Sequence, residues 1–295
     1  MSKTDSRSPT LDCRSALYMP ATNLRALRKG PSLAADAIVL DLEDSVGPDQ
    51  KALARSQAIA AISANDYGYR IRALRINAAD TKWHSDDILT AIEARPDVIV
   101  LPKVETARDV QEVRERLSQH SGLDNIEIWA MIESPRAILN AQEIASCSDY
   151  GLSALLIGNN DMARESNMPV SSDRTYLVPW LMQLVAVAHV NSLALLDGVY
   201  NDFADVAGFC SECEQGVAMG MTGKTLIHPS QIPIANEAYS PSEADVVQAQ
   251  AIVDAFAQPE NAAVGVLQIN GRMIERLHLA MATQLLNRVE RLNHR

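Results

Sequence analysis

The sequence predicts an α/β fold, a TIM (β/α)8 barrel followed by a C-terminal helical lid or arm. Short apolar runs alternate with longer helical patterns, which is typical of βαβ units and a parallel sheet. Eight such units occupy roughly 230 residues, the size of a TIM barrel. Aromatic residues make up only 4% of the 295 residues, so the core must be aliphatic, as in parallel sheets covered by helices.

The expected strands are apolar runs of four to six residues: Ser15–Pro20, Ala37–Leu42, Ala73–Asn77, Val98–Pro102, Ile128–Ile132, Ala154–Gly158, Leu193–Asp197 and Thr225–His228. Between them the pattern predicts helices over Asp49–Ile62, Ala107–Leu117, Pro135–Ala145, Tyr176–Val190 and Ala204–Met219. A doubly wound sheet is the alternative. It usually begins with a glycine-rich turn, and this sequence has neither G-x-G-x-x-G nor a P-loop lysine motif.

We expect three parts: a flexible N-terminus over 1–12, the barrel over 13–239, and a C-terminal lid or oligomerisation segment over 240–295. Ser242 is a helix N-cap followed by acidic residues, and the helix it opens is expected to end near Ala257. An apolar run over Val264–Ile269 and a turn then precede a last amphipathic helix, expected over Met273–Leu292.

Composition excludes several classes of protein. The net charge is −11 with no basic cluster, so we expect no nucleic-acid partner. No apolar run approaches the roughly 20 residues of a membrane span, and the N-terminus does not resemble a signal peptide. Cys210 and Cys213 lie within an expected helix, without further zinc ligands nearby. We expect a cytoplasmic protein without membrane association.

Polar or charged residues follow nearly every expected strand. In a TIM barrel these positions share one rim, where the active site lies. Solvation alone explains a polar residue at any single strand end, but seven together are hard to explain in that way. The groups are Asp41–Asp44, Arg75–Asn77, Pro102–Glu105, Glu133–Pro135, Asn159–Asp161, Asp197–Gly198 and His228–Pro229.

The donor types at this rim favour a hard metal ion. Carboxylates and amides predominate, with one histidine and no cysteine, which favours Mg²⁺, or Mn²⁺, over zinc. Glu133 and Asp161 end adjacent strands and are the expected metal ligands. Glu43 and Asp44 either hold metal-bound waters or cap a strand end. Arg75 either pairs with a neighbouring acid or binds a substrate oxygen.

Several motifs in order resemble the HpcH/HpaI aldolase and citrate lyase β-subunit superfamily, in its stand-alone, CitE-like CoA-ester lyase branch. The matches run over about 230 residues and into Gly271-Arg272-Met273-Ile274. They are Arg14-Ser15-x-Leu17-x-x-Pro20, Asp41-Leu42-Glu43-Asp44-Ser45-Val46, Arg75-Ile76-Asn77, Leu101-Pro102-Lys103-Val104-Glu105, Ile132-Glu133-Ser134-Pro135, Gly158-x-Asn160-Asp161, Asp197-Gly198-x-Tyr200-x-Asp202-Phe203 and Gly223-Lys224-x-x-Ile227-His228-Pro229-x-Gln231.

The resemblance implies a Mg²⁺-dependent barrel that cleaves or forms a C–C bond β to a thioester. It implies that Glu133 and Asp161 bind Mg²⁺ directly, and that Glu43 and Asp44 hold its waters. Arg75 would bind the thioester or oxoacid oxygen, with Asn160 in the same substrate site. The first strand end would line the CoA side of the pocket, through Tyr18, Met19 and Asn23.

The resemblance also implies a catalytic acid on the C-terminal segment that reaches into a neighbouring subunit. That acid is commonly Asp, whereas this chain has Glu275. The extra methylene is expected to change proton delivery and to favour thioester hydrolysis over C–C chemistry. An exposed acid in the first turn of a helix is the simpler interpretation.

We expect a lyase that acts on a malyl-, methylmalyl- or citramalyl-type CoA thioester and gives an acyl-CoA and a 2-oxoacid. The alternatives are a (3S)-malyl-CoA thioesterase on the same site, a citrate lyase β-subunit that acts on an acyl-carrier-protein thioester within a complex, and an idle scaffold. A swapped C-terminal arm would give a homotrimer or homohexamer.

Overall fold

A computed structural model describes residues 9–169, 171, 173–261 and 264–295. The chain divides into two compact units between Tyr239 and Ser240. Within the described ranges, every helix falls short of the length and apolar character that a membrane span requires.

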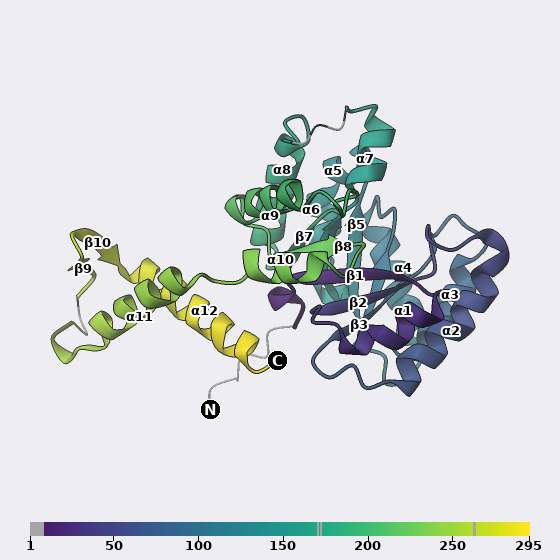
Figure 1. The fold of residues 1–295 in the computed structure, drawn as a ribbon, viewed down its shortest axis with the longest axis horizontal. Coiled ribbons are helices and arrows are strands. Elements are labelled where there is room, and N and C mark those ends of the chain that lie inside the picture. The colour runs from purple at the N-terminus through teal and green to yellow at the C-terminus, as the bar shows by residue number, and fades with distance from the viewer. Residues whose placement is uncertain (1–8, 170, 172, 262–263) are drawn as a thin grey trace. The chain divides into compact units, whose positions relative to one another are not determined.

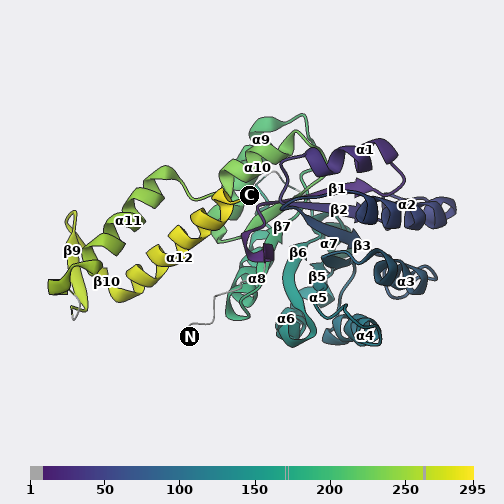
Figure 2. The same cartoon turned by 90° about the horizontal axis from the view of Figure 1, so that it is seen from below.

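The first unit is a closed barrel of parallel strands, which confirms the predicted fold class (Figures 1 and 2). Neighbouring strands follow chain order, and β8 closes the barrel against β1. The observed bounds match the expected strands to within two residues at each end. They are β1 Ser15–Pro20, β2 Ala37–Asp41, β3 Ile71–Arg75, β4 Val98–Leu101, β5 Glu127–Ile132, β6 Leu152–Ile157, β7 Ala194–Asp197 and β8 Gly223–Leu226.

Helices surround the barrel (Figure 2). The expected helix over Pro135–Ala145 is two short helices that meet at Asn140, because the Ser134 cap and Pro135 begin one turn that Asn140 ends. The helices are α1 Leu24–Lys29, α2 Lys51–Ala64, α3 His84–Ala94, α4 Ala107–Ser118, α5 Pro135–Leu139, α6 Ala141–Ala145, α7 Asn159–Ser166, α8 Val178–Val190, α9 Val206–Met219 and α10 Gln231–Ala238.

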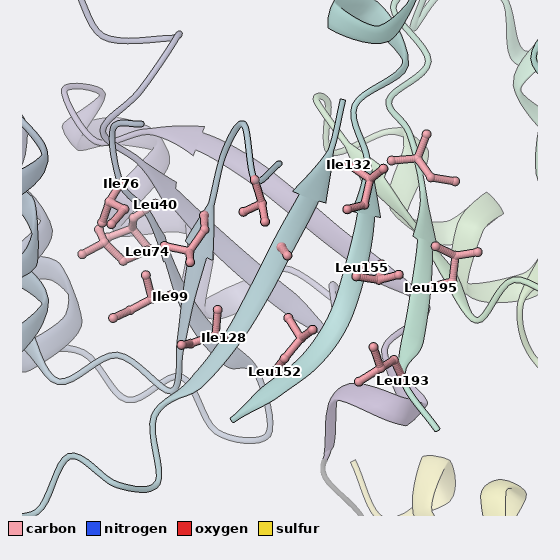
Figure 3. Close-up of a cluster of buried hydrophobic side chains, with 14 of the residues drawn as sticks. Leu40, Leu74, Ile76, Ile99, Ile128, Ile132, Leu152, Leu155, Leu193 and Leu195 are labelled. Atoms are coloured by element: carbon pink, nitrogen blue, oxygen red, sulfur yellow. The ribbon is translucent and has the colours of Figure 1, made fainter. Parts of the chain in front are cut away.

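Alternation along the strands makes two cores. One set of side chains packs between the strands and the helices; it includes Leu74, Ile99 and Ile128, which are register partners on neighbouring strands (Figure 3). The other set fills the barrel interior and is built from small residues around the buried Trp129. Residues next to the interior set along each strand therefore point outward.

Residues 9–12 differ from the predicted flexible N-terminus. They form a 3-10 helix, and Thr10 and Asp12 are buried. Thr10 Oγ1 accepts a hydrogen bond of 3.2 Å from Trp129 Nε1 and donates one of 2.5 Å to Glu127 Oε2. This short helix satisfies the indole N–H of the interior core. Residues 1–8 lie outside the described residues.

The second unit contains α11 Glu243–Ala257, β9 Val266–Ile269, β10 Arg272–Glu275 and α12 Arg276–Asn293. Ser242 and Asp245 form the capping box that opens α11. The prediction of a last helix beginning at Met273 is wrong, because Met273 pairs with Gln268 in an antiparallel hairpin. The turn at Asn270 and Gly271, both with positive φ, sets up this pairing. A small apolar cluster around Ile252, Phe256 and Ile274 holds the unit together.

Candidate active site

A cavity of about 390 Å³ lies at the C-terminal ends of the barrel strands. Six of the residues predicted from the sequence line it: Tyr18, Asp44, Arg75, Glu133, Asn160 and Asp161. Met131, Thr225 and Asn201 complete part of the wall and were not predicted. Alternation along β5 and β8 would have located the first two, because Met131 and Thr225 lie on the inward-facing side of their strands.

Arg75 is the cation of this cavity, and Asp41 fixes its direction. Nε and Nη2 of Arg75 each donate to a different oxygen of Asp41 at 2.6 Å. Burial lowers the pKa of Arg75, but Asp41 outweighs this effect and raises it; Arg75 in turn holds the pKa of Asp41 below its usual range despite burial. The ring of Tyr18 lies 4.7 Å from the guanidinium carbon. Of the two alternatives for Arg75, the pairing with a neighbouring acid is present, and it orients the guanidinium.

Glu43 lies behind Arg75 and is not part of the cavity wall. Its Oε2 is 3.0 Å from Arg75 Nη1, and it accepts a hydrogen bond of 3.0 Å from the backbone of Asp44. Burial raises the pKa of Glu43 to about 7, against the opposing effect of Arg75. Asp44 is exposed and lies in the cavity wall. The two acids therefore occupy different environments, although they are adjacent in sequence.

Lys51 holds the turn that carries Glu43, a role that was not predicted. Its buried Nζ donates to the carbonyl oxygens of Leu42 and Glu43 at 2.8 and 2.9 Å, and to Asn77 Oδ1 at 2.7 Å. Asn77 in turn donates to Asp87 Oδ2 at 2.6 Å. A lysine in the first turn of a helix is ordinarily solvated, so no local pattern indicates this role.

Glu133 enters the cavity from the end of β5 and is buried. Its Oε1 accepts a hydrogen bond of 2.5 Å from the backbone N–H of Lys103. Lys103 adopts a left-handed conformation, with φ of 53°, which is uncommon for a residue with a side chain. Burial raises the pKa of Glu133 to about 7, and the negative charges of Asp161 and Glu43 act in the same direction.

Asn160 and Asp161 lie in the first turn of α7, directly after β6. Asp161 Oδ1 is 2.5 Å from Arg164 Nη2, one turn along the helix. Gly158 precedes them, and a Cβ there would lie 2.4 Å from Cβ of Glu133. Only glycine permits this approach of β6 to Glu133. The motif Gly158-x-Asn160-Asp161 thus places Glu133 and Asp161 in one cavity.

The residues present fit Mg²⁺. Glu133 and Asp161 supply carboxylate oxygens to the same cavity, and the pKa of Glu133 is raised first by burial and then by the charges of Asp161 and Glu43, so a bound cation would favour its ionised form. Within the described part of the chain, no three His, Cys, Asp or Glu side chains converge as metal ligands. Mg²⁺ commonly binds through one or two carboxylates and keeps the other positions for water and substrate, so two ligands suffice.

Two residues predicted for the CoA side do not line the cavity. Met19 is buried between β1 and the helices, beside Gly30 and Ile38, because it follows the inward-facing Tyr18 and must point outward. Asn23 is exposed and caps α1, where its side chain accepts from the N–H of Ala26 at 3.1 Å. The prediction that these two side chains line the pocket is wrong for this cavity.

Not every polar group at a strand end lines the cavity. Asp197 faces outward from β7, fully buried, and binds Lys224 Nζ at 2.9 Å and Arg174 Nη1 at 2.7 Å. Both cations hold the pKa of Asp197 below its usual range. His228 stacks on Phe203, with ring centroids 4.6 Å apart. The prediction that all these groups meet at one site is therefore too broad, since strand alternation sends some of them outward.

Glu275 lies in the second unit as the N-cap of α12. Its side chain accepts from the backbone of His278, and its own N–H donates to His278 Nδ1 at 2.9 Å. This capping box replaces the predicted position in the first helical turn. The cause is the β10 hairpin, which delays the start of the helix to Arg276.

Comparison with known proteins shows several relatives. The chain is 41% identical over 277 residues to a (3S)-malyl-CoA thioesterase of Cereibacter sphaeroides, covering 94% of each chain. It is 32% identical to an L-malyl-CoA/beta-methylmalyl-CoA lyase of the same species, covering 96% of each. A solved structure of CitE from Mycobacterium tuberculosis in complex with magnesium, acetoacetate and coenzyme A is 26% identical, with a TM-score of 0.76 over 93% of this chain and 97% of that one.

A family model for HpcH/HpaI aldolase/citrate lyase matches residues 14–229, which include every residue described above as lining the cavity. The resemblance seen in the motifs is thereby confirmed, and the chain belongs to the HpcH/HpaI aldolase/citrate lyase family.

Proposed function

We propose that this protein is a Mg²⁺-dependent enzyme that acts on a malyl-type CoA thioester and that hydrolyses the thioester bond. The supporting observation is the joint presence of Glu133, Asp161 and the oriented Arg75 in one cavity. This arrangement offers two carboxylate ligands for a metal ion beside a fixed cation, and such a cation stabilises the negative charge that develops on a thioester oxygen. A relative with thioesterase activity at 41% identity favours hydrolysis over the C–C cleavage expected from the motifs.

Glu133 and Asp161 would hold the metal ion. When bound, Mg²⁺ supplies a Lewis acid for the hydroxyl and carboxylate oxygens of a malyl group. Arg75 stabilises the charge that develops on the thioester oxygen. Asp41 keeps the guanidinium in place, so little reorganisation accompanies the reaction. The Tyr18 ring covers Arg75 and restricts its contact with water.

In hydrolysis, water adds to the thioester carbonyl carbon and gives up a proton to a base. The C–S bond then breaks, and the thiolate leaves and takes up a proton. We propose Glu275 of a second copy as this base, with Asp44 in the cavity wall as the alternative. A base supplied by a second copy requires an assembly, and we propose a homotrimer or homohexamer.

C–C cleavage is the second candidate, favoured by the lyase relative at 32% identity. In that reaction the hydroxyl loses its proton, the C–C bond breaks, and the electron pair forms the enolate of an acyl-CoA. Arg75 would face the enolate oxygen, and a carboxylic acid must then protonate the enolate carbon. The products are an acyl-CoA and a 2-oxoacid in place of a free hydroxyacid and CoA.

Product analysis with malyl-CoA and Mg²⁺ tests the proposal. Wild type is expected to give malate and free CoA, and Glu275→Gln is expected to lose at least 100-fold in kcat. Glu275→Asp is the matched variant, because it keeps the carboxyl group and restores the shorter acid, so it should raise the share of glyoxylate and acetyl-CoA. Glyoxylate and acetyl-CoA as the sole products of wild type would overturn hydrolysis in favour of the lyase.

A further inference from the structure

A second cavity adjoins the candidate active site. It measures about 240 Å³ and is walled mainly by apolar groups from α7, the segment before α8 and the segment after β7. We call it the side cavity and define it by Ala163, Met168, Pro169, Leu177, Val199 and Tyr200. An apolar cavity of about 150 Å³ is large enough for benzene, so the side cavity has room for a phenyl group or a short alkyl chain.

The two cavities share one wall. Asn159, Asn160, Val199 and Asn201 line both. Asn160 and Asn201 exchange two hydrogen bonds, of 3.2 and 2.8 Å, between their exposed amide groups. Exposed hydrogen bonds of this kind contribute little net free energy, since water replaces them. The partition between the cavities therefore opens at small cost when both amides turn away.

The far end of the side cavity is electrically balanced. Arg174 and Glu212 line it and lie 3.6 Å apart between Nη1 and Oε1. Lys224 and Asp197 complete the group, so two cations face two anions. Arg174 Nη2 has no hydrogen-bond partner among the described residues and offers one N–H to a polar atom at the far end, whereas the remaining walls are mainly apolar and suit an uncharged apolar group.

The wall that the two cavities share lies next to the proposed metal ligands, and this position determines which part of a substrate faces the side cavity. Asn160 immediately precedes Asp161, one of the two proposed metal ligands. Under the proposed function, the hydroxyl-bearing carbon and its carboxylate lie at that end of the active site, away from the CoA chain. We propose that the side cavity receives an apolar substituent on this carbon, so that the enzyme accepts acids with side chains longer than methyl.

This inference rests on the proposed function, and binding of free 2-oxoacids tests it without requiring turnover. A series with increasing side chains is glyoxylate, pyruvate, 2-oxobutyrate, 2-oxovalerate and phenylpyruvate. Each is titrated calorimetrically into the full chain with Mg²⁺ present. Every methylene that enters an apolar cavity is expected to tighten binding roughly threefold to fourfold. We therefore expect 2-oxovalerate to bind about tenfold more tightly than pyruvate.

Two filling variants locate the effect. Met168→Trp and Ala163→Leu fill the side cavity from different elements. Each is expected to weaken the binding of 2-oxovalerate at least tenfold and to change the affinity for glyoxylate less than twofold. Met182→Trp is the matched control, because Met182 is exposed on α8 and lines neither cavity. With two independent variants, misfolding of one does not prevent the test.

The outcomes separate the two proposals. If glyoxylate binds with Mg²⁺ but longer acids bind more weakly, the side cavity is not a substituent site and the proposed function stands. The same conclusion follows if both filling variants weaken glyoxylate and 2-oxovalerate equally. If no oxoacid binds at all, this inference fails, whereas the proposed function is judged separately by the release of malate and free CoA from malyl-CoA.

Discussion

Replacing Glu133 with glutamine should stabilise the metal-free protein. The pKa of Glu133 rises from 4.5 to about 7 in the folded state because the group is buried beside Asp161 and Glu43. Folding therefore binds a proton between these two pH values. The contribution of Glu133 to the stability of wild type is therefore most favourable below about pH 4.5 and is lost as the pH rises through 7. A difference of about 2.5 pH units, at 1.36 kcal/mol each, corresponds to about 3 kcal/mol.

Glu133→Gln removes this penalty and keeps an oxygen for the N–H of Lys103. With EDTA present, its free energy of unfolding should exceed that of wild type by about 3 kcal/mol at pH 8 and by about 1 kcal/mol at pH 5. Urea denaturation followed by tryptophan fluorescence measures the difference, because all three tryptophans, Trp83, Trp129 and Trp180, lie in the barrel unit.

Glu93→Gln, an exposed change on α3, is the control and should leave stability unchanged at both pH values. Added Mg²⁺ should then stabilise wild type and not Glu133→Gln, because a ligand that binds only the folded state stabilises it by mass action. A Glu133→Gln protein that is less stable than wild type at pH 8, or a difference that does not change with pH, would refute the reasoning.

Three further changes test how the site is built. Lys51→Met leaves two buried carbonyl oxygens of the turn after β2 without their donor, and should cost roughly 3 kcal/mol in urea denaturation; the exposed Lys29→Met should cost nothing measurable. Lys103→Val should lose roughly 1–3 kcal/mol and weaken Mg²⁺ binding by calorimetry, because a β-branched residue resists positive φ, whereas Lys103→Gly should keep both. Gly158→Ala should abolish Mg²⁺ binding through its clash with Glu133 while the far-UV circular dichroism stays native; retained binding would mean that Glu133 moves freely.

The sequence was sufficient for the barrel and for much of the cavity wall, because both follow from short-range patterns. Short, continuous apolar runs define the strands, and residues after β5 and β6, such as Glu133 and Asp161, must share the C-terminal rim. The motif places Met19 at the pocket, but strand alternation with the inward-facing Tyr18 turns its side chain outward. Lys51 was missed because its partners come from two other segments, which no local pattern records.

Two acidic clusters lie near this end of the barrel, and their charge balance separates a structural role from a chemical one. In the outward-facing cluster two cations meet two carboxylates, and the pKa of Asp197 is held low. Around the cavity, Arg75 pairs with Asp41 and Glu43, Arg164 pairs with Asp161, and Lys103 approaches Glu43 only to 4.0 Å. The four carboxylates of this cluster are Asp41, Glu43, Glu133 and Asp161. The pKa values of Glu43 and Glu133 rise to about 7.

A fold gains nothing from a buried carboxylate that must be protonated at neutral pH. A protein can keep an excess of buried negative charge where a bound cation neutralises it. A single divalent ion supplies two positive charges. The outward-facing cluster needs no such ligand, although both clusters end neighbouring strands of the same barrel. Mg²⁺ is therefore expected to stabilise the protein by binding in the cavity around Glu133, and not by binding to the outward-facing cluster.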